Sequence, residues 1–106
     1  DMGSRMNRTT VIVMTEFGRR AYENSGLGTD HGRGSVMFAR GGHVQGGKVH
    51  GHWPGLEEHE LEGPGDLRVT TDYRRVLAEA LSKRMGVTAP GAIFPGFEYS
   101  PVQIFN

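Results

Sequence analysis

The chain of 106 residues is long enough for one domain with a modest hydrophobic core. Lys and Arg balance Asp and Glu, 12 against 12, so there is no excess of positive charge of the kind that binds nucleic acid or an anionic membrane. The absence of cysteine excludes disulfides and thiolate zinc sites, which leaves His, Asp and Glu as metal ligands. The 17 glycines predict a chain rich in loops.

The start of the chain resembles the middle of a domain. Residues 1–8 carry neither a helix-start signal nor the basic-then-apolar pattern of an export signal, and they lead directly into an apolar run. No stretch of about 18 apolar residues is present. We therefore expect residues 1–106 to form a single domain that is the carboxyl-terminal fragment of a longer one, with neither nucleic acid nor a membrane as partner.

The first predicted element is a strand near residues 9–15. This segment is a continuous β-branched and apolar run, typical of a parallel strand that is covered on both faces. The polar, Gly-rich segment from Glu16 to Gly34 then predicts a long loop at the carboxyl end of the strand. Ligands bind at this edge of open α/β sheets, so the loop is the place to look for chemistry.

The middle of the chain predicts short strands and irregular structure. A short apolar strand is expected near residues 35–40, followed by a Gly-rich reversal over 41–47. Residues 48–52 are compatible with a short edge strand, and residues 53–65 read as an acidic irregular segment. Trp53 is interpreted as a core or interface aromatic residue, as is Tyr73 farther along.

A helix near residues 72–85 is the clearest prediction. Apolar residues recur there at three- and four-residue steps: Tyr73, Val76, Leu77, Ala80, Leu81 and Met85. Thr71 or Asp72 can cap the amino end, and Gly86 suits the left-handed position after the last turn. Residues 92–97 are expected to pack as an extended segment. Together these elements predict an α/β fold.

Two groups in the Glu16–Gly34 segment are candidates for metal chemistry. Glu16 follows the predicted buried strand directly, so its carboxylate is expected either to bind a cation or to pair with Arg19 or Arg20. Asp30 and His31 place a carboxylate beside an imidazole, which suits a metal ligand and its orienting neighbour. The alternative for this pair is an ordinary hydrogen-bonded histidine in a surface loop.

Other histidines and motifs carry weaker signals. His50 and His52 would share one face of a strand, with His43 and His59 nearby, which is compatible either with chelation or with an exposed edge strand. The glycines of 26–32 lack the Gly-x-Gly-x-x-Gly spacing of a dinucleotide site. No Gly-x-Ser-x-Gly elbow is present, so a serine hydrolase of that kind is not expected.

Four ordered motifs resemble the family known as domain of unknown function 1501: residues 15–19 (Thr-Glu-Phe-Gly-Arg), 28–32 (Gly-Thr-Asp-His-Gly), 70–74 (Thr-Thr-Asp-Tyr-Arg) and 94–97 (Phe-Pro-Gly-Phe). Members of that family are longer proteins, often with a twin-arginine export signal, and are grouped with the alkaline phosphatase and sulfatase superfamily. The resemblance implies a partial alkaline phosphatase-like α/β sheet and an exported, periplasmic protein.

The same resemblance implies site residues. Glu16 corresponds to a metal-binding Asp of the superfamily and His31 to its late metal-binding His. Asp30 becomes a neighbour that orients a ligand, or a possible ligand itself, and Arg19 a possible anion contact. A divalent metal such as zinc or manganese is implied. Phe17 stands where the superfamily has a His, so one metal position would be weakened or lost.

Two functions follow as expectations. The first is part of a metal-dependent hydrolase of phosphate or sulfate esters, inactive as this fragment because the nucleophile lies outside it. The second is a non-catalytic binding or assembly module, which the replacement at Phe17 favours. Because a truncated sheet would expose strand edges and apolar surface, we also expect self-association or pairing with the upstream half of the parent domain.

Overall fold

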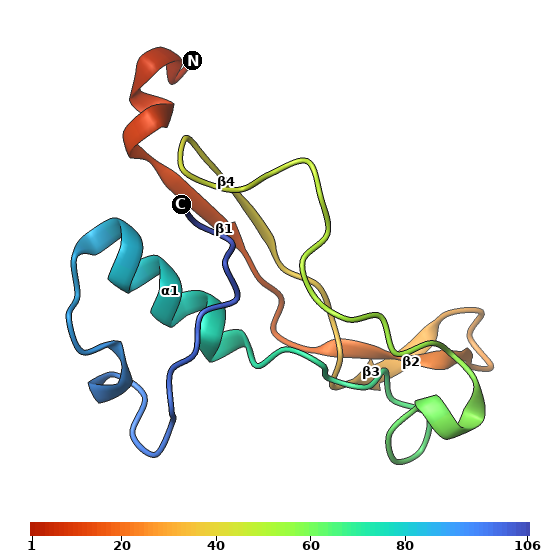
Figure 1. The fold of residues 1–106 in the computed structure, drawn as a ribbon. Coiled ribbons are helices and arrows are strands. Elements are labelled where there is room, and N and C mark those ends of the chain that lie inside the picture. The colour runs from red at the N-terminus through yellow and green to blue at the C-terminus, as the bar shows by residue number, and fades with distance from the viewer. The chain divides into compact units, whose positions relative to one another are not determined.

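A computed structural model describes residues 1–106 (Figure 1). The chain forms two compact units, which are described separately below. Unit 1 comprises Asp1–Ile12, Ala39–Gly51 and Thr71–Asn106, and unit 2 comprises Val13–Phe38 and His52–Thr70. No helix in the structure is long and apolar enough to cross a membrane.

The predicted parallel sheet does not form. The structure contains two separate two-stranded sheets, one of β1 (Thr10–Val13) with β4 (Phe38–Gly41) and one of β2 (Gly18–Glu23) with β3 (Thr29–Gly32). Together with a single α-helix, these small sheets make the prediction of a partial alkaline phosphatase-like α/β fold wrong.

The strand predicted near residues 9–15 is shorter and less covered than expected. Along β1, half-buried and exposed residues alternate, and Val13 is 52% exposed. β4 shows the same alternation and lies a few residues after the start of the predicted 35–40 strand. An apolar, β-branched run favours a strand whether one face or both are covered, so its composition did not determine the burial.

Helix α1 (Tyr73–Met85) confirms the prediction of a helix near 72–85. The Asp72 carboxylate accepts a hydrogen bond from the Arg74 N–H at 2.9 Å, which caps the amino end. Gly86 adopts a left-handed conformation with φ of 69°, and its N–H donates to the Leu81 carbonyl. The buried residues of α1 are Val76, Ala78 and Glu79, whereas Met85 is 74% exposed.

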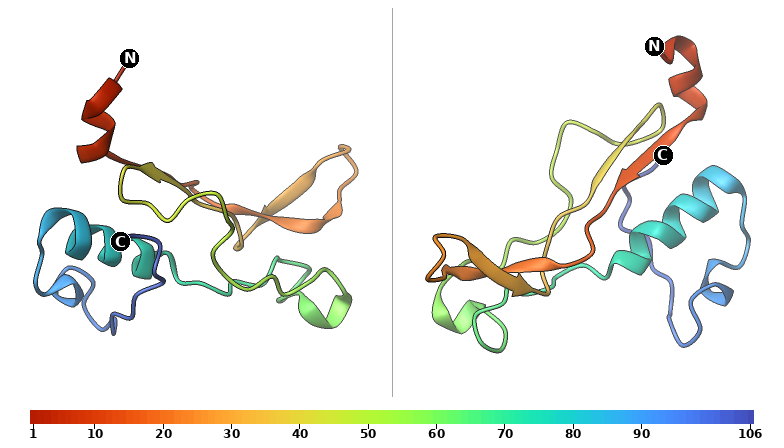
Figure 2. Two further views of the ribbon diagram at one scale, coloured as in Figure 1. Left: turned by 45° about the horizontal axis from the view of Figure 1, so that its top comes forward. Right: turned by 180° about the vertical axis from the view of Figure 1, so that it is seen from behind.

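Unit 1 also contains two short 3-10 helices, η1 (Gly3–Arg8) and η3 (Pro90–Ala92). The core of unit 1 forms where α1 meets the segment Phe97–Asn106, which we call the strap. Ile104 and Phe105 of the strap are buried, as are Val76 and Ala78 of α1. Figure 2 shows the strap running beside the helix.

The strap is also tied by its backbone to the turn that follows β4. Val44 and Phe105 form an antiparallel bridge, and the Gln45 N–H donates to the Ile104 carbonyl at 2.7 Å. The Asn106 N–H donates to the His43 carbonyl at 2.9 Å. These bonds satisfy strap groups that would otherwise lie unpaired at the edge of the core.

Unit 2 is built around the antiparallel hairpin β2–β3, where the sequence had predicted a long loop. The register pairs Gly18 with Gly32 and Glu23 with Thr29, with an irregularity between Arg19 and Glu23. The connection begins at Asn24, whose side-chain oxygen accepts from the Gly26 and Gly28 N–H groups at 2.9 and 3.2 Å. The breaker cluster read as a loop is therefore the turn of a hairpin.

The buried residues of unit 2 are the glycines Gly18, Gly34 and Gly65. A Cβ on Gly18 would overlap the Gly34 backbone, and one on Gly65 would lie 2.6 Å from the Tyr22 ring. The Arg19 N–H donates to the Gly34 carbonyl, and the Ala21 N–H donates to the Gly65 carbonyl. Backbone packs directly against backbone here, which only glycine permits.

Two smaller predictions are wrong, that of an edge strand over 48–52 and that of an extended segment over 92–97. Residues 48–52 form no strand, and the 53–65 segment contains the 3-10 helix η2 (Glu58–Glu60). Trp53 is 67% exposed and is not a core residue within unit 2. Residues 92–97 contain turns instead of an extended segment. Each segment carries Gly or Pro, whose local turn preference outweighed the apolar residues between them.

Candidate functional site

The hairpin of unit 2 brings together the two motifs that carry the candidate metal chemistry. Residues 15–19 lead into β2, and residues 28–32 lead into and form β3. The strand register sets Arg19 opposite His31. Two segments about a dozen residues apart in sequence thus lie side by side, through backbone pairing that the loop prediction did not foresee.

One face of the hairpin carries an aromatic and cationic cluster. The rings of Phe17 and His31 are stacked, with centroids 3.6 Å apart and planes inclined by 22°. The Arg19 guanidinium lies over the Phe17 ring, 5.3 Å from its centroid, and donates to the Thr29 carbonyl at 2.7 Å. Phe17, Arg19 and His31 are all exposed, so this cluster can meet a solute from solvent.

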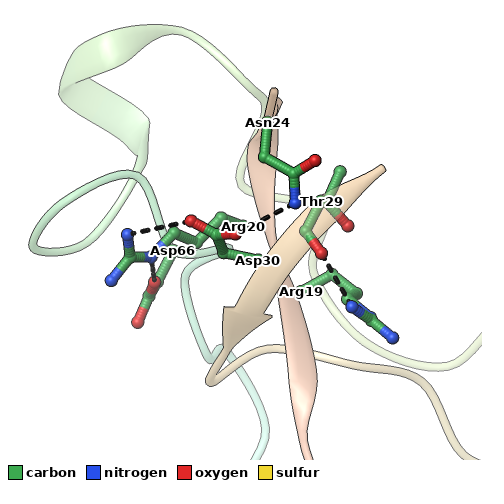
Figure 3. Close-up of polar contacts among 6 residues, drawn as sticks. All are labelled: Arg19, Arg20, Asn24, Thr29, Asp30 and Asp66. Carbon is green, nitrogen blue, oxygen red and sulfur yellow. Dashed lines mark hydrogen bonds and ion pairs between the residues drawn. The ribbon is translucent and has the colours of Figure 1, made fainter. Parts of the chain in front are cut away.

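A polar cluster centred on Arg20 contains Asp30 (Figure 3). The Arg20 guanidinium lies 3.3 Å from the Asp66 carboxylate and 3.7 Å from that of Asp30. The Asn24 amide donates to Asp30 at 3.0 Å. Because Asp30 and His31 are consecutive in a strand, their side chains leave opposite faces of the hairpin. Asp30 is therefore engaged with Arg20 and Asn24.

Glu16 lies at the bend that precedes β2, with its side chain exposed. Glu16 and His31 are donors of the right chemistry for zinc or manganese. A protein metal site normally needs three or four protein ligands, however, and the structure gathers no group of three or more His, Asp or Glu side chains. These two residues fit a metal only as part of a larger ligand set.

The other histidines are distributed between the two units. His43 and His50 belong to unit 1, whereas His52 and His59 belong to unit 2. The His50 Nε2 atom lies 2.8 Å from the Gln45 carbonyl oxygen, which is an ordinary hydrogen bond within unit 1. Without a strand over 48–52, the alternation that favoured chelation by His50 and His52 no longer applies.

The groups with shifted pKa values lie in unit 1. The hydrogen bond from the Arg74 side chain lowers the pKa of Asp72 and raises that of Arg74. Burial raises the pKa of Tyr99 above its ordinary value, and the nearby negative charge of Glu79 adds to this shift. The first pair of shifts arises at the amino end of α1, and the shift of Tyr99 arises where the strap packs on the helix.

Glu79 is the residue that sequence reasoning missed. It lies on α1 between the apolar positions Val76 and Ala80, and a glutamate at such a place usually reaches solvent. The side chain is 0% exposed and accepts hydrogen bonds from the strap backbone. The sequence carries no local signal for this, because the donors lie more than 20 residues away and are backbone groups.

Comparison with known families identifies the chain. The model of the family described as "Protein of unknown function (DUF1501)" matches residues 1–94. The chain belongs to this family. The match includes the hairpin, α1 and the turn at η3. No curated protein matches the chain, and no solved structure matches it.

Proposed function

We propose that this member of the DUF1501 family contributes part of the site of a metal-dependent hydrolase of phosphate or sulfate esters. The observation that carries the proposal is the register of the hairpin, which sets the Thr15–Arg19 motif against the Gly28–Gly32 motif. A relation to the alkaline phosphatase and sulfatase superfamily, implied by the resemblance of these motifs, is part of the proposal. The fold described above lends it no support.

Glu16 and His31 are the proposed metal ligands. Both side chains are exposed, and both belong to the segments that the hairpin aligns. A bound divalent cation would act as a Lewis acid toward an ester oxygen. Because a complete site needs further donors, we propose that these come from outside residues 1–106, as does the nucleophile.

Arg19 is the proposed contact for the anionic group of the substrate. One N–H group of its guanidinium donates to the Thr29 carbonyl. Because a guanidinium has five N–H donors in a planar fork, the remaining donors can bind phosphate or sulfate oxygens. Arg20 and Arg33, by contrast, are paired with carboxylates of Asp66 and Glu62. Asp30 supports the site indirectly, by holding Arg20 and Asn24.

The test is the metal content of the purified full-length protein, measured by elemental analysis after equilibration with zinc or manganese. We expect His31→Ala to lower the bound metal, because an imidazole ligand is lost. His59→Ala is the matched control, since His59 is an exposed histidine of the same unit and should leave the metal content unchanged. Equal stoichiometry in wild type and His31→Ala would refute the proposal.

A non-catalytic binding or assembly module is the second candidate. It is favoured by the Phe17 ring, which covers one face of the His31 imidazole and occupies the position of an expected ligand. Half of the large apolar side chains are also exposed, among them Val36, Phe38 and Trp53. This function includes self-association as its simplest form. It predicts a mass above that of one chain by light scattering at high concentration; a monomer would contradict it.

The motif resemblance also supports a proposal about location. Export to the periplasm is proposed, because relatives in this family often carry a twin-arginine signal. Fractionation of bacterial cells that express the full-length protein tests this. Recovery in the cytoplasmic fraction, with a periplasmic control enzyme correctly exported, would overturn it.

A further inference from the structure

The carboxylate of Glu79 is held in a cage of backbone donors. Its Oε1 atom accepts from the N–H groups of Val102 and Gln103 at 2.6 and 2.7 Å. Its Oε2 atom accepts from those of Ile104 and Phe105 at 2.6 and 2.8 Å. Four consecutive backbone N–H groups thus converge on one buried side chain, all within unit 1.

Two further side chains of α1 hold the strap. The Arg75 guanidinium donates to the carbonyls of Ser100 and Pro101 at 2.9 and 3.0 Å. The Arg74 guanidinium lies over the Phe97 ring, 4.6 Å from its centroid. Side chains of the helix therefore bind mainly the backbone of the strap. The Glu79 carboxylate accepts from its N–H groups, and the Arg75 guanidinium donates to its carbonyls.

The strap has a strained conformation that only this contact explains. Gln103 has φ of 68°, in the left-handed region that non-glycine residues rarely adopt. This conformation turns successive N–H groups toward the same side, as in backbone nests that bind anions. Here the anion is Glu79, so the strain at Gln103 and the charge of Glu79 depend on each other.

We propose that Phe97–Asn106 is a strap that opens and closes on α1 as a unit, with Glu79 as its latch. In the closed state, the four N–H groups are satisfied by one carboxylate and are withdrawn from water. In the open state, water satisfies the same groups and Gln103 is released from its left-handed conformation. Opening also breaks the backbone bonds to the turn after β4 and exposes Ile104 and Phe105, so the closed state is the favoured one.

Closure of the strap also assembles a cavity. A pocket of about 310 Å³ is lined by Gln45, Glu79, Lys83, Pro101, Gln103, Phe105 and Asn106. Because Pro101, Gln103, Phe105 and Asn106 belong to the strap, the pocket exists only when the strap is latched. A molecule that binds in this pocket would therefore favour the closed state by linkage.

Amide hydrogen exchange on the whole protein tests the proposal. We expect Glu79→Gln to raise the exchange rate of the 102–105 amides by roughly ten- to a hundredfold, because a neutral amide has one acceptor oxygen and a charge-assisted hydrogen bond is lost. The amides of Val76–Leu81 in α1 should lose less protection than those of the strap. Glu98→Gln is the matched control: Glu98 is an exposed glutamate of the strap and should leave the exchange rates unchanged.

A second measurement needs no substitution. In wild-type protein at low denaturant, the 102–105 amides should exchange through an opening that exposes less surface than the opening of α1. Unchanged protection of the strap in Glu79→Gln would overturn the latch. Exchange of strap and helix at the same rate and with the same denaturant dependence, in either protein, would overturn the strap as a separate unit.

Discussion

The two units of this chain differ in the kind of residue that they bury. Unit 1 buries side chains: those of Val76, Ala78, Pro90, Ile104, Phe105 and the charged Glu79. Unit 2 buries only glycines, at Gly18, Gly34 and Gly65. The first gains its stability from apolar area and from a satisfied charge, the second from close backbone contact and backbone hydrogen bonds. Apolar side chains and a buried charge therefore matter most for the stability of unit 1, and glycines matter most for the stability of unit 2.

Charge shows the same contrast. Glu79 is withdrawn from water and depends entirely on its four N–H partners. The Arg20 pairs with Asp66 and Asp30 are partly solvated, and such pairs stabilise a protein by little. Substitution of a charged residue should consequently be severe in unit 1 and mild in unit 2.

The largest expected effect is that of Glu79→Ala. It leaves four buried N–H groups without an acceptor, and each unsatisfied donor costs about 1–3 kcal/mol, part of which is recovered when the strap opens to water. We expect a loss on the order of 4 kcal/mol in the free energy that holds the strap on α1, measured by hydrogen exchange of the 102–105 amides at low denaturant. Glu98→Ala should change it by less than about 0.5 kcal/mol.

The glycine packing of unit 2 is tested by Gly18→Ala. The new Cβ would overlap the Gly34 carbonyl, so β2 must shift, at a cost of about 2 kcal/mol. Loss of protection at the β2–β3 amides in hydrogen exchange measures this. Gly28→Ala is the control in the same hairpin, because its Cβ would make only ordinary contact with Asn24. Equal effects of the two variants would refute close packing at Gly18.

An intermediate effect is expected at the start of α1. Asp72→Ala removes the helix cap, which costs about 1 kcal/mol at neutral pH. Because the folded state lowers the pKa of Asp72 from 3.8, this stabilisation is present above that pH and is lost as the pH falls through the folded pKa. Urea denaturation of wild type and variant should therefore converge below about pH 4. A constant difference down to pH 2 would contradict the pKa shift.

The smallest effect is expected in the polar cluster of unit 2. Asp66→Asn weakens the partly solvated pair with Arg20, and a solvated ion pair stabilises a protein by about 0.5 kcal/mol. The difference should shrink further between low and high salt, because salt screens solvated charges. Thermal denaturation at two salt concentrations measures it. A loss as large as that of Glu79→Ala would contradict the contrast between the two units.

Local sequence signals predicted the helix of this fold well. The helix near 72–85, its Asp72 cap and its Gly86 end are all present, because periodicity and capping depend on residues within one or two turns. The turn residues Asn24–Gly28 were also recognised as a breaker. They were read as part of a loop because the flanking 18–23 and 29–32 segments are polar and lack the apolar alternation of strands.

The candidate site was predicted only in part. The sequence singled out Glu16 and His31, and the hairpin aligns the two segments that contain them. Phe17 was recognised as a departure from the expected ligand, but its stacking on His31 was not foreseen. Asp30 was expected to orient His31, whereas it contacts Arg20 and Asn24. Strand pairing decides which neighbours share a face, and no strand is predicted from the sequence of this segment.

The sequence by itself determined where the helix begins and ends, that the chain breaks at Asn24–Gly28, and which family it belongs to. Tertiary structure alone decided that Glu79 is the most deeply buried charge and that glycines are the packed residues of unit 2. The reason is that both features depend on backbone groups distant in sequence. Backbone N–H and C=O groups are the same at every residue, so their convergence leaves no pattern of side chains to read.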